Sequence, residues 1–160
     1  MTKLKEELKS TTEYKSPAHE VFLSLLVTVD RISRRHAEFM SEYGVSPKQY
    51  NILRILRGAG HAGLPVMEIG RRMIEKSPDV SRIIDRLIDM GLAKRRRQRN
   101  DRRVVMVTIA KKGLDLLEQM DDPVDDEVVL MLGGMKNDEL KQLADLLEKV
   151  RESVYAQTGE

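Results

Sequence analysis

The chain has 160 residues, 41% of them hydrophobic and 34% charged, which is the balance of one ordinary globular domain. It contains no cysteine or tryptophan and few other aromatics, which excludes disulfides, thiolate catalysis and cysteine-based zinc or redox sites and favours an aliphatic core packed between helices. The net charge of +2 hides an asymmetry, because residues 1–110 carry 22 Lys and Arg against 13 Asp and Glu, whereas residues 111–160 carry 6 against 13. The basic part indicates a surface that meets a polyanion.

Neither membrane insertion nor secretion is expected. No stretch approaches the roughly 20 uncharged apolar residues of a membrane-spanning helix, and residues 1–15 are too charged for a signal peptide. The sequence therefore predicts a cytoplasmic protein without a membrane partner.

The first long helix is expected over residues 16–40. Ser16 suits the N-cap position and Pro17 the first helical position. Its apolar residues cover more than the one face that packing on a single domain surface would need: Phe22, Leu23, Leu25, Leu26, Val27, Val29 and Ile32. This helix should therefore make a second buried contact.

A second helix should begin at Ser46, because Ser46 and Gln49 have the spacing of a capping box. Its apolar pattern runs to Gly58, where the helix is expected to end. Residues 58–63 then predict a flexible turn.

A short helix over 66–73 and a longer one over 77–90 follow. Ser77 and Pro78 mark the start of the longer helix, and Gly91 is placed to stop it. Its buried face should consist of Val80, Ile83, Ile84, Leu87 and Ile88. The opposite face is polar and carries Asp79, Arg82, Asp85, Arg86 and Asp89.

A β-hairpin is expected next, because residues 92–97 and 104–109 are β-prone and flank the polar segment 98–101. Residues 94–103 hold seven cations and one anion, a charge density that no core accepts. The hairpin should therefore present a basic surface.

This order of short helix, tight connection, second helix and basic hairpin is the plan of a winged helix-turn-helix. Arg82 and Arg86 suit guanine edges in the major groove, and the hairpin arginines suit a narrow minor groove. Binding should weaken steeply with salt, because phosphate contacts release counterions. Two plainer interpretations stay open: a hairpin that is only solvated, and local helix pairs that tie Arg82 and Arg86 to Asp85 and Asp89.

After Ala110 the helical pattern returns, with Pro123 expected to break or kink it, and a last helix is expected near 137–155. Both terminal helical regions are over-rich in apolar positions. They should pack together and against a second subunit.

Three short stretches resemble the signature of the MarR family: Gly91-Leu92, Asp101-Arg102-Arg103, and Val-Thr-Ile-Ala-Lys-Lys-Gly at 107–113. The resemblance extends over nearly the whole chain. It implies a single domain over 1–160, mainly α with a small β-hairpin wing, whose winged helix-turn-helix DNA-binding lobe spans 46–110. The N- and C-terminal helices, over 16–40 and 111–156, would form a dimerisation region.

By this resemblance the protein would be a triangular homodimer that binds double-stranded promoter DNA, with recognition helices in successive major grooves and wings in the flanking minor grooves. The family pattern assigns DNA contact to a wing Asp and the Arg two residues later, here Asp101 and Arg103. With the helix and hairpin positions, the expected DNA-binding residues are Ser77, Pro78, Asp79, Ser81, Arg82, Arg86, Arg97, Arg99, Asp101, Arg102 and Arg103. Ala110 replaces the Thr that usually caps the family's next helix, which forfeits about 1 kcal/mol.

The resemblance also implies that a small aromatic or phenolic anion releases the DNA by binding between the dimerisation region and the DNA-binding lobe. The residues expected at that junction are His36, Met40, Tyr43, Tyr50 and Arg54. The alternative is that Met40 and Tyr50 are simply core. The three histidines lack metal-ligand spacing, so neither a metal nor another cofactor is expected.

An enzyme is not expected, because no nucleophile with an adjacent base, phosphate-cradling glycine loop or metal site can be assembled. A winged-helix module that binds RNA or an acidic protein is the alternative function, because both also attract a basic hairpin. Repression is favoured over activation, since a compact dimer without an activation module acts most simply by occluding a promoter.

Overall fold

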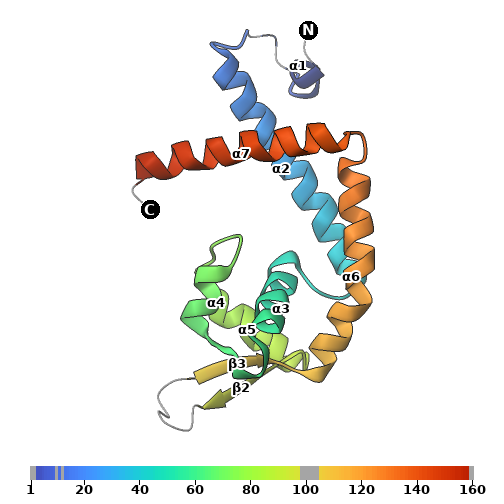
Figure 1. Cartoon of the computed structure of the whole chain (residues 1–160), viewed down its shortest axis with the longest axis vertical. Coiled ribbons are helices and arrows are strands. Elements are labelled where there is room, and N and C mark those ends of the chain that lie inside the picture. Colours follow the sequence, from blue (N-terminus) through green and yellow to red (C-terminus); the bar gives the residue numbers. More distant parts are fainter. Residues whose placement is uncertain (1–2, 10, 12, 98–104, 159–160) are drawn as a thin grey trace. The chain divides into compact units, whose positions relative to one another are not determined.

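The computed structural model describes residues 3–9, 11, 13–97 and 105–158, and it contains two compact units, Met1–Met120 and Asp121–Glu160 (Figure 1). The first unit holds the helices α1 (Lys3–Glu7) to α5 (Val80–Asp89), a small sheet and the start of α6 (Lys111–Leu132). The second unit holds the rest of α6 and the last helix. Among the described residues, no helix combines the length and the apolar character that crossing a bilayer requires.

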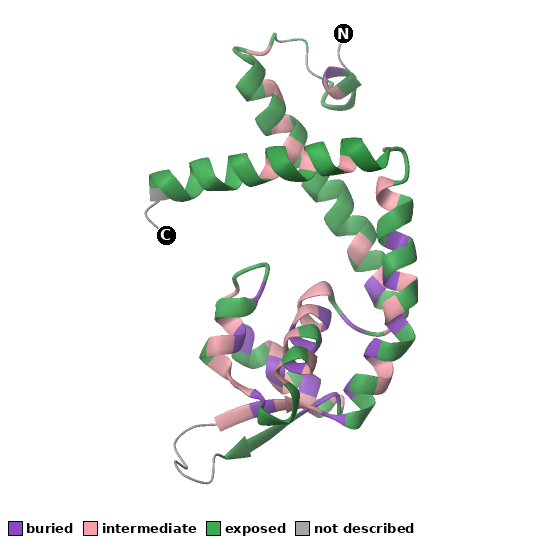
Figure 2. Cartoon of the chain, in the orientation of Figure 1, coloured by how far each residue is buried: buried purple, intermediate pink, exposed green. Residues whose placement is uncertain are grey.

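The first long helix, α2 (Pro17–Glu42), begins where the sequence predicts. The Ser16 hydroxyl accepts a hydrogen bond of 3.2 Å from the backbone N–H of His19, and Pro17 occupies the first helical turn. Most of its apolar side chains are exposed, including Phe22 at 58% and Val29 at 59% (Figure 2). Within the first unit, the helix therefore keeps an uncovered apolar surface.

The capping box of α3 (Pro47–Ala59) is confirmed. Gln49 Oε1 accepts from the Ser46 backbone N–H at 2.8 Å, and the Ser46 hydroxyl accepts from the Gln49 N–H at 3.3 Å. The helix continues one residue past Gly58, so its predicted end is wrong by one residue. Residues that follow form a 3-10 turn, η1 (Gly60–Ala62).

A short strand, β1 (Leu64–Pro65), pairs with β3 (Val105–Ile109) and is absent from the sequence prediction. At Gly63, just before it, a Cβ would lie 2.3 Å from the Val107 carbonyl oxygen, and φ is +69°. Only glycine fits this close approach and this backbone conformation. The expected flexible turn over 58–63 is therefore wrong at its end, where the backbone is held against the sheet.

The two helices of the helix-turn-helix are α4 (Val66–Arg72) and α5 (Val80–Asp89). The predicted start of α5 at Ser77 is wrong by three residues. Ser77 Oγ accepts a weak hydrogen bond of 3.4 Å from the Asp79 N–H, a local turn that stands where a helix N-cap was expected. Gly91 does stop the helix, with φ +74° and a hydrogen bond from its N–H to the Ile88 carbonyl at 2.8 Å.

The wing is an antiparallel pair of strands, β2 (Ala93–Arg97) and β3 (Val105–Ile109), within a three-stranded sheet of order β1-β3-β2. The expected hairpin strands are confirmed, and the mainly helical fold class with them. Fully buried side chains from α3, α4, α5, β3 and α6 form the core beneath the sheet (Figure 2), namely Ile52, Leu53, Leu56, Ile69, Ile84, Leu87, Val107 and Leu117.

The helix α6 (Lys111–Leu132) runs through Pro123, so of the two expected effects, a break or a kink, the break is wrong. A proline removes one helical hydrogen bond, and the flanking turns of this long helix hold the backbone on both sides. The last helix, α7 (Asn137–Thr158), is where the sequence predicts it.

Candidate nucleic-acid interface

The candidate recognition helix α5 has the two faces that its periodicity predicts. Ile84 and Leu87 are fully buried and Val80 is 8% exposed, whereas Ile83 and Ile88 are half-buried. The polar face carries Asp79, Ser81, Arg82 and Arg86, all exposed, and Arg82 exposes 82% of its side chain. A solvated row of polar side chains on a helix is the form that enters a major groove.

Arg82 and Arg86 form fewer and weaker ion pairs with their acidic neighbours than the spacing in the sequence would permit. Arg82 Nη1 lies 3.6 Å from Asp79 Oδ1, and both side chains are well exposed, so this pair contributes little. Arg86 forms no ion pair with any residue within the described ranges. Asp85 and Asp89, the partners expected from the sequence, form no ion pair with either arginine among the described residues, and Asp85 pairs with the wing instead.

An ion pair joins the recognition helix to the wing. Arg95 Nη1 on β2 lies 2.6 Å from Asp85 Oδ1 on α5, with both side chains about half exposed. Along a strand, side chains alternate between faces, so Arg95 shares its face with Arg97, and Lys94 and Arg96 point to the opposite face. Sequence reasoning missed this link, because four consecutive cations from Lys94 to Arg97 do not show which of them meets the helix.

The turn before α5 adds cations that the sequence prediction lacks. Ser77 and Pro78 line a hollow of about 370 Å³ together with Arg71 and Lys76. Lys76 Nζ donates a hydrogen bond of 2.5 Å to the Arg71 carbonyl oxygen. Positive charge therefore lies at the entry to α5 as well as along it.

Arg97, at the end of β2, is exposed. The other predicted wing residues, Arg99, Asp101, Arg102 and Arg103, lie outside the described residues.

Three of the five residues expected to bind a small ligand surround one cavity of about 470 Å³. His36 of α2 and Tyr50 and Arg54 of α3 line it, with Met73 and Ile74 from the connection to α5. Arg54 Nη1 donates a hydrogen bond of 2.9 Å to the Tyr50 hydroxyl, and its guanidinium lies 5.8 Å from the centre of that ring.

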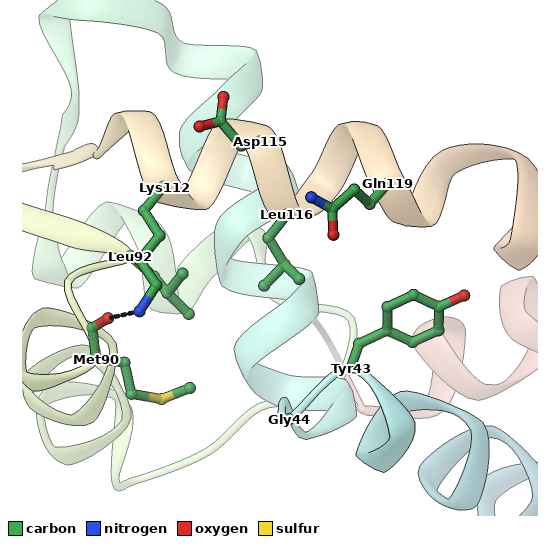
Figure 3. Close-up of a pocket in the computed structure, with 8 residues that line it drawn as sticks. All are labelled: Tyr43, Gly44, Met90, Leu92, Lys112, Asp115, Leu116 and Gln119. Atoms are coloured by element: carbon green, nitrogen blue, oxygen red, sulfur yellow. Dashed lines mark hydrogen bonds between the residues drawn. The ribbon is translucent and has the colours of Figure 1, made fainter.

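The other two expected ligand residues lie elsewhere. Met40 is fully buried in the core. Tyr43 lines a different cavity, of about 390 Å³, with Met90, Lys112 and Leu116 (Figure 3). There Lys112 Nζ donates a hydrogen bond of 2.9 Å to the Met90 carbonyl oxygen, at the C-terminal end of α5.

Two contacts fasten the connection between α4 and α5 to α3, beside the 470 Å³ cavity. Asn51 Oδ1 accepts from the Ile74 backbone N–H at 3.0 Å, and Lys48 Nζ lies 2.7 Å from Glu75 Oε1. The position of the segment that leads into α5 therefore depends on the wall of this cavity.

Comparison with known proteins gives a consistent result. A model of the MarR family matches residues 43–104, which span α3 to the wing. A MarR transcription factor from Planctomyces limnophilus is 38% identical over 85% of this chain and 98% of its own, with a TM-score of 0.66. The regulator MhqR of Bacillus subtilis is 24% identical over 82% of this chain and 92% of its own. A mutant MarR from E. coli, crystallised with operator DNA, is 23% identical over 87% and 99%, with a TM-score of 0.75. The chain belongs to the MarR family, whose members are transcriptional regulators rather than enzymes.

Proposed function

We propose that this protein represses transcription in the cytoplasm by binding a near-palindromic promoter site as a homodimer. The observation that carries the proposal is the exposed polar face of α5 beside a basic wing, with the two elements joined by the Asp85–Arg95 pair. The related fold of the E. coli MarR mutant, crystallised with operator DNA, supports the same use of this surface.

In the proposed complex, α5 enters the major groove and the wing reaches the flanking minor groove. Arg82 and Arg86 read base edges, since a guanidinium pairs in bidentate fashion with guanine. The wing cations contact phosphates and fix the register of the protein on the duplex. This division of roles predicts sequence preference from α5 and salt dependence mainly from the wing.

A homodimer is supported by the uncovered apolar surface of α2. Val21, Phe22, Leu26 and Val29 are each more than half exposed in this chain. Removing apolar area from water stabilises an association by roughly 25 cal/mol per Å² before the costs of binding. A second copy that covers this surface would also place two recognition helices on one duplex.

A small aromatic or phenolic anion is the proposed effector, with the 470 Å³ cavity as its site. Arg54 offers a cation and Tyr50 a ring to such a ligand. Because Asn51 and Lys48 hold residues 74 and 75 beside the cavity, a bound ligand that displaces them would shift the start of α5. Salicylate added to the protein–DNA complex should then release the DNA, and release should fail in the variant Arg54→Ala.

Selection of genomic fragments by the purified protein tests the DNA-binding function most directly. A regulator retains a small set of fragments with half-sites about 10 bp apart and prefers them to random duplex or RNA of equal length. The variant Arg151→Ala, which removes an exposed arginine of α7, controls for charge loss alone. Equal retention of RNA and random DNA would favour the alternative, a winged-helix module for RNA or acidic proteins.

A further inference from the structure

The candidate recognition helix α5 ends in a complete glycine cap. The Gly91 N–H donates a hydrogen bond of 2.8 Å to the Ile88 carbonyl, and the Leu92 N–H donates one of 2.8 Å to the Leu87 carbonyl. Together these two bonds form a Schellman motif, in which Gly91 takes the left-handed position with φ +74°. The cap does not use the carbonyls of Met90 and Leu92, so these two acceptors need partners from another element.

The beginning of α6 supplies both partners. The backbone N–H of Ala110, one residue before α6, donates a hydrogen bond of 2.9 Å to the Leu92 carbonyl. The Lys112 ammonium donates a hydrogen bond of 2.9 Å to the Met90 carbonyl (Figure 3). The C-terminal end of α5 is therefore fastened to α6 by a backbone bond and by a side-chain bond.

The backbone of α6 approaches closely enough for this side-chain bond to form. A Cβ at Gly113 would lie 2.3 Å from the Leu92 carbonyl oxygen, so the approach depends on glycine at this position. The stem of Lys112 lies beside Gly91, where a Cβ would be 3.8 Å from Lys112 Cδ. From there the ammonium reaches the Met90 carbonyl.

The charge of Lys112 suits this place. The last carbonyls of a helix carry partial negative charge, and a cation beside them is stabilising. The neighbouring Lys111 is used differently, because its ammonium lies 2.9 Å and 3.1 Å from the two carboxylate oxygens of Asp115 on the same helix. Two adjacent lysines of α6 therefore carry the same charge, and only the second of them bonds to the end of α5.

The orientation of α5 matters more for reading bases than for attraction to phosphates. A bidentate bond between a guanidinium and a guanine edge is lost when the helix shifts by on the order of 1 Å. Attraction between a cation and a phosphate fades only over the screening length, roughly 10 Å in moderate salt. An anchor at the end of α5 should therefore affect discrimination between sequences before it affects general affinity for DNA.

We propose that Lys112 is a positioning residue for sequence recognition. Its bond to the Met90 carbonyl holds α5 in the orientation in which Arg82 and Arg86 read base edges, and Lys112 itself contacts neither base nor phosphate. This inference rests on the proposed DNA-binding function. It adds to that function a residue that acts through the recognition helix rather than on the DNA.

The variant Lys112→Met tests the proposal, because methionine keeps an apolar stem beside Gly91 and removes the donor. Lys112 is exposed, so the change leaves no buried gap. Fluorescence anisotropy gives the ratio of affinity for the preferred duplex to affinity for random duplex. This ratio should fall by about tenfold, since a hydrogen bond from a charged group is lost. Affinity for random duplex should stay within about twofold of the wild type, with the same salt slope.

The matched control is Lys111→Met, which removes the same charge one residue earlier and should keep the wild-type ratio within about twofold. Lys112→Arg should restore the ratio to within about threefold, because a guanidinium can still donate to the Met90 carbonyl. Lower stability alone does not move the ratio, since a smaller folded fraction lowers both affinities by the same factor. An unchanged ratio in Lys112→Met would overturn the proposal, and a shallower salt slope beside it would make Lys112 a phosphate contact.

Hydrogen exchange without DNA tests the anchor separately from the DNA-binding function. In Lys112→Met the backbone amides of residues 90–92 should exchange about tenfold faster, whereas in Lys111→Met they should exchange as in the wild type. Unchanged exchange in Lys112→Met would overturn the proposal even for a specific regulator. A wild-type protein that binds every duplex equally would instead refute the proposed function, and the exchange rates would still show whether Lys112 holds the end of α5.

Discussion

Arg82 combines high exposure with a weak partner. Its side chain is 82% exposed, and the carboxylate nearest to it, 3.6 Å away on Asp79, is itself exposed. An arginine held so loosely can turn to a base edge at little cost, since an exposed ion pair contributes at most about 1 kcal/mol. The residue is therefore free to read sequence.

Replacement of Arg82 by alanine should lower affinity for the cognate site by about 1–3 kcal/mol, or about 5- to 150-fold, and relax the preference at one base pair. Fluorescence anisotropy with the cognate duplex and single-base variants measures both effects. An equal loss on every duplex would reassign Arg82 to a phosphate contact.

Asp85 acts on the wing through Arg95, which lies 2.6 Å away. The variant Asp85→Asn removes a negative charge from the surface that we propose contacts phosphates, and it releases Arg95 from its partner. Affinity for random duplex should rise by about three- to tenfold, and the ratio of specific to random affinity should fall. Asp145→Asn on α7 removes one exposed acid elsewhere and should leave this ratio unchanged. A preserved ratio in Asp85→Asn would show that the pair plays no part in discrimination.

Among the elements, the helices with side-chain caps could be predicted from sequence. Ser16 and the pair Ser46 and Gln49 begin their helices as expected, because each cap depends on residues within three positions. The observed start of α5 lies after the predicted one, because the Ser77 hydroxyl accepts a hydrogen bond from the Asp79 N–H in a local turn. The strand β1 was missed because its two residues are held by pairing with β3, more than 40 positions away.

The same limit applies to the site. Periodicity within α5 predicts the exposure of Arg82 and Arg86, since it needs only local spacing. Two features of the site depend instead on how separate elements pack: the Asp85–Arg95 pair, and the cavity that groups His36, Tyr50 and Arg54. The residue pattern of a single segment does not predict such packing. The expectations for Arg99, Asp101, Arg102 and Arg103 stay predictions.

Gly63 fixes the junction between η1 and the sheet. Alanine there would bring a Cβ to 2.3 Å from the Val107 carbonyl and hold φ at +69°, so the free energy of unfolding should fall by about 2–4 kcal/mol. Gly58→Ala is the control, because its Cβ meets nothing within 4 Å inside α3, and alanine there should stabilise by up to about 1 kcal/mol. Urea denaturation compares the two, and an unchanged midpoint for Gly63→Ala would contradict the observed packing.

In the proposed homodimer, the apolar surface of α2 would join two copies, and the cations of α5 and the wing would contact one duplex. Two copies joined in this way would double the number of phosphate contacts, and the salt slope of DNA binding grows with that number. A variant that cannot dimerise should therefore also lose affinity for DNA.

Val29→Glu places a charge in the middle of this surface, at a residue that is 59% exposed in the single chain. Burying an unpaired carboxylate is costly, so the variant should sediment as a monomer and lose most of its affinity for a palindromic duplex. Ile74→Glu, at an apolar residue 88% exposed outside α2, should sediment as the wild type does. If the wild-type protein itself sediments as a monomer at micromolar concentration, the proposed homodimer is wrong.

The register of β2 makes this strand tolerant of substitution and intolerant of a change in length. Inserting one residue before Lys94 would rotate every later side chain of β2 to the other face. Arg95 would leave Asp85, and a cation that now lies on the opposite face, such as Arg96, would turn toward the recognition helix. Evolution can therefore retune either face by point mutation, while insertions and deletions should be confined to the segment between the two wing strands.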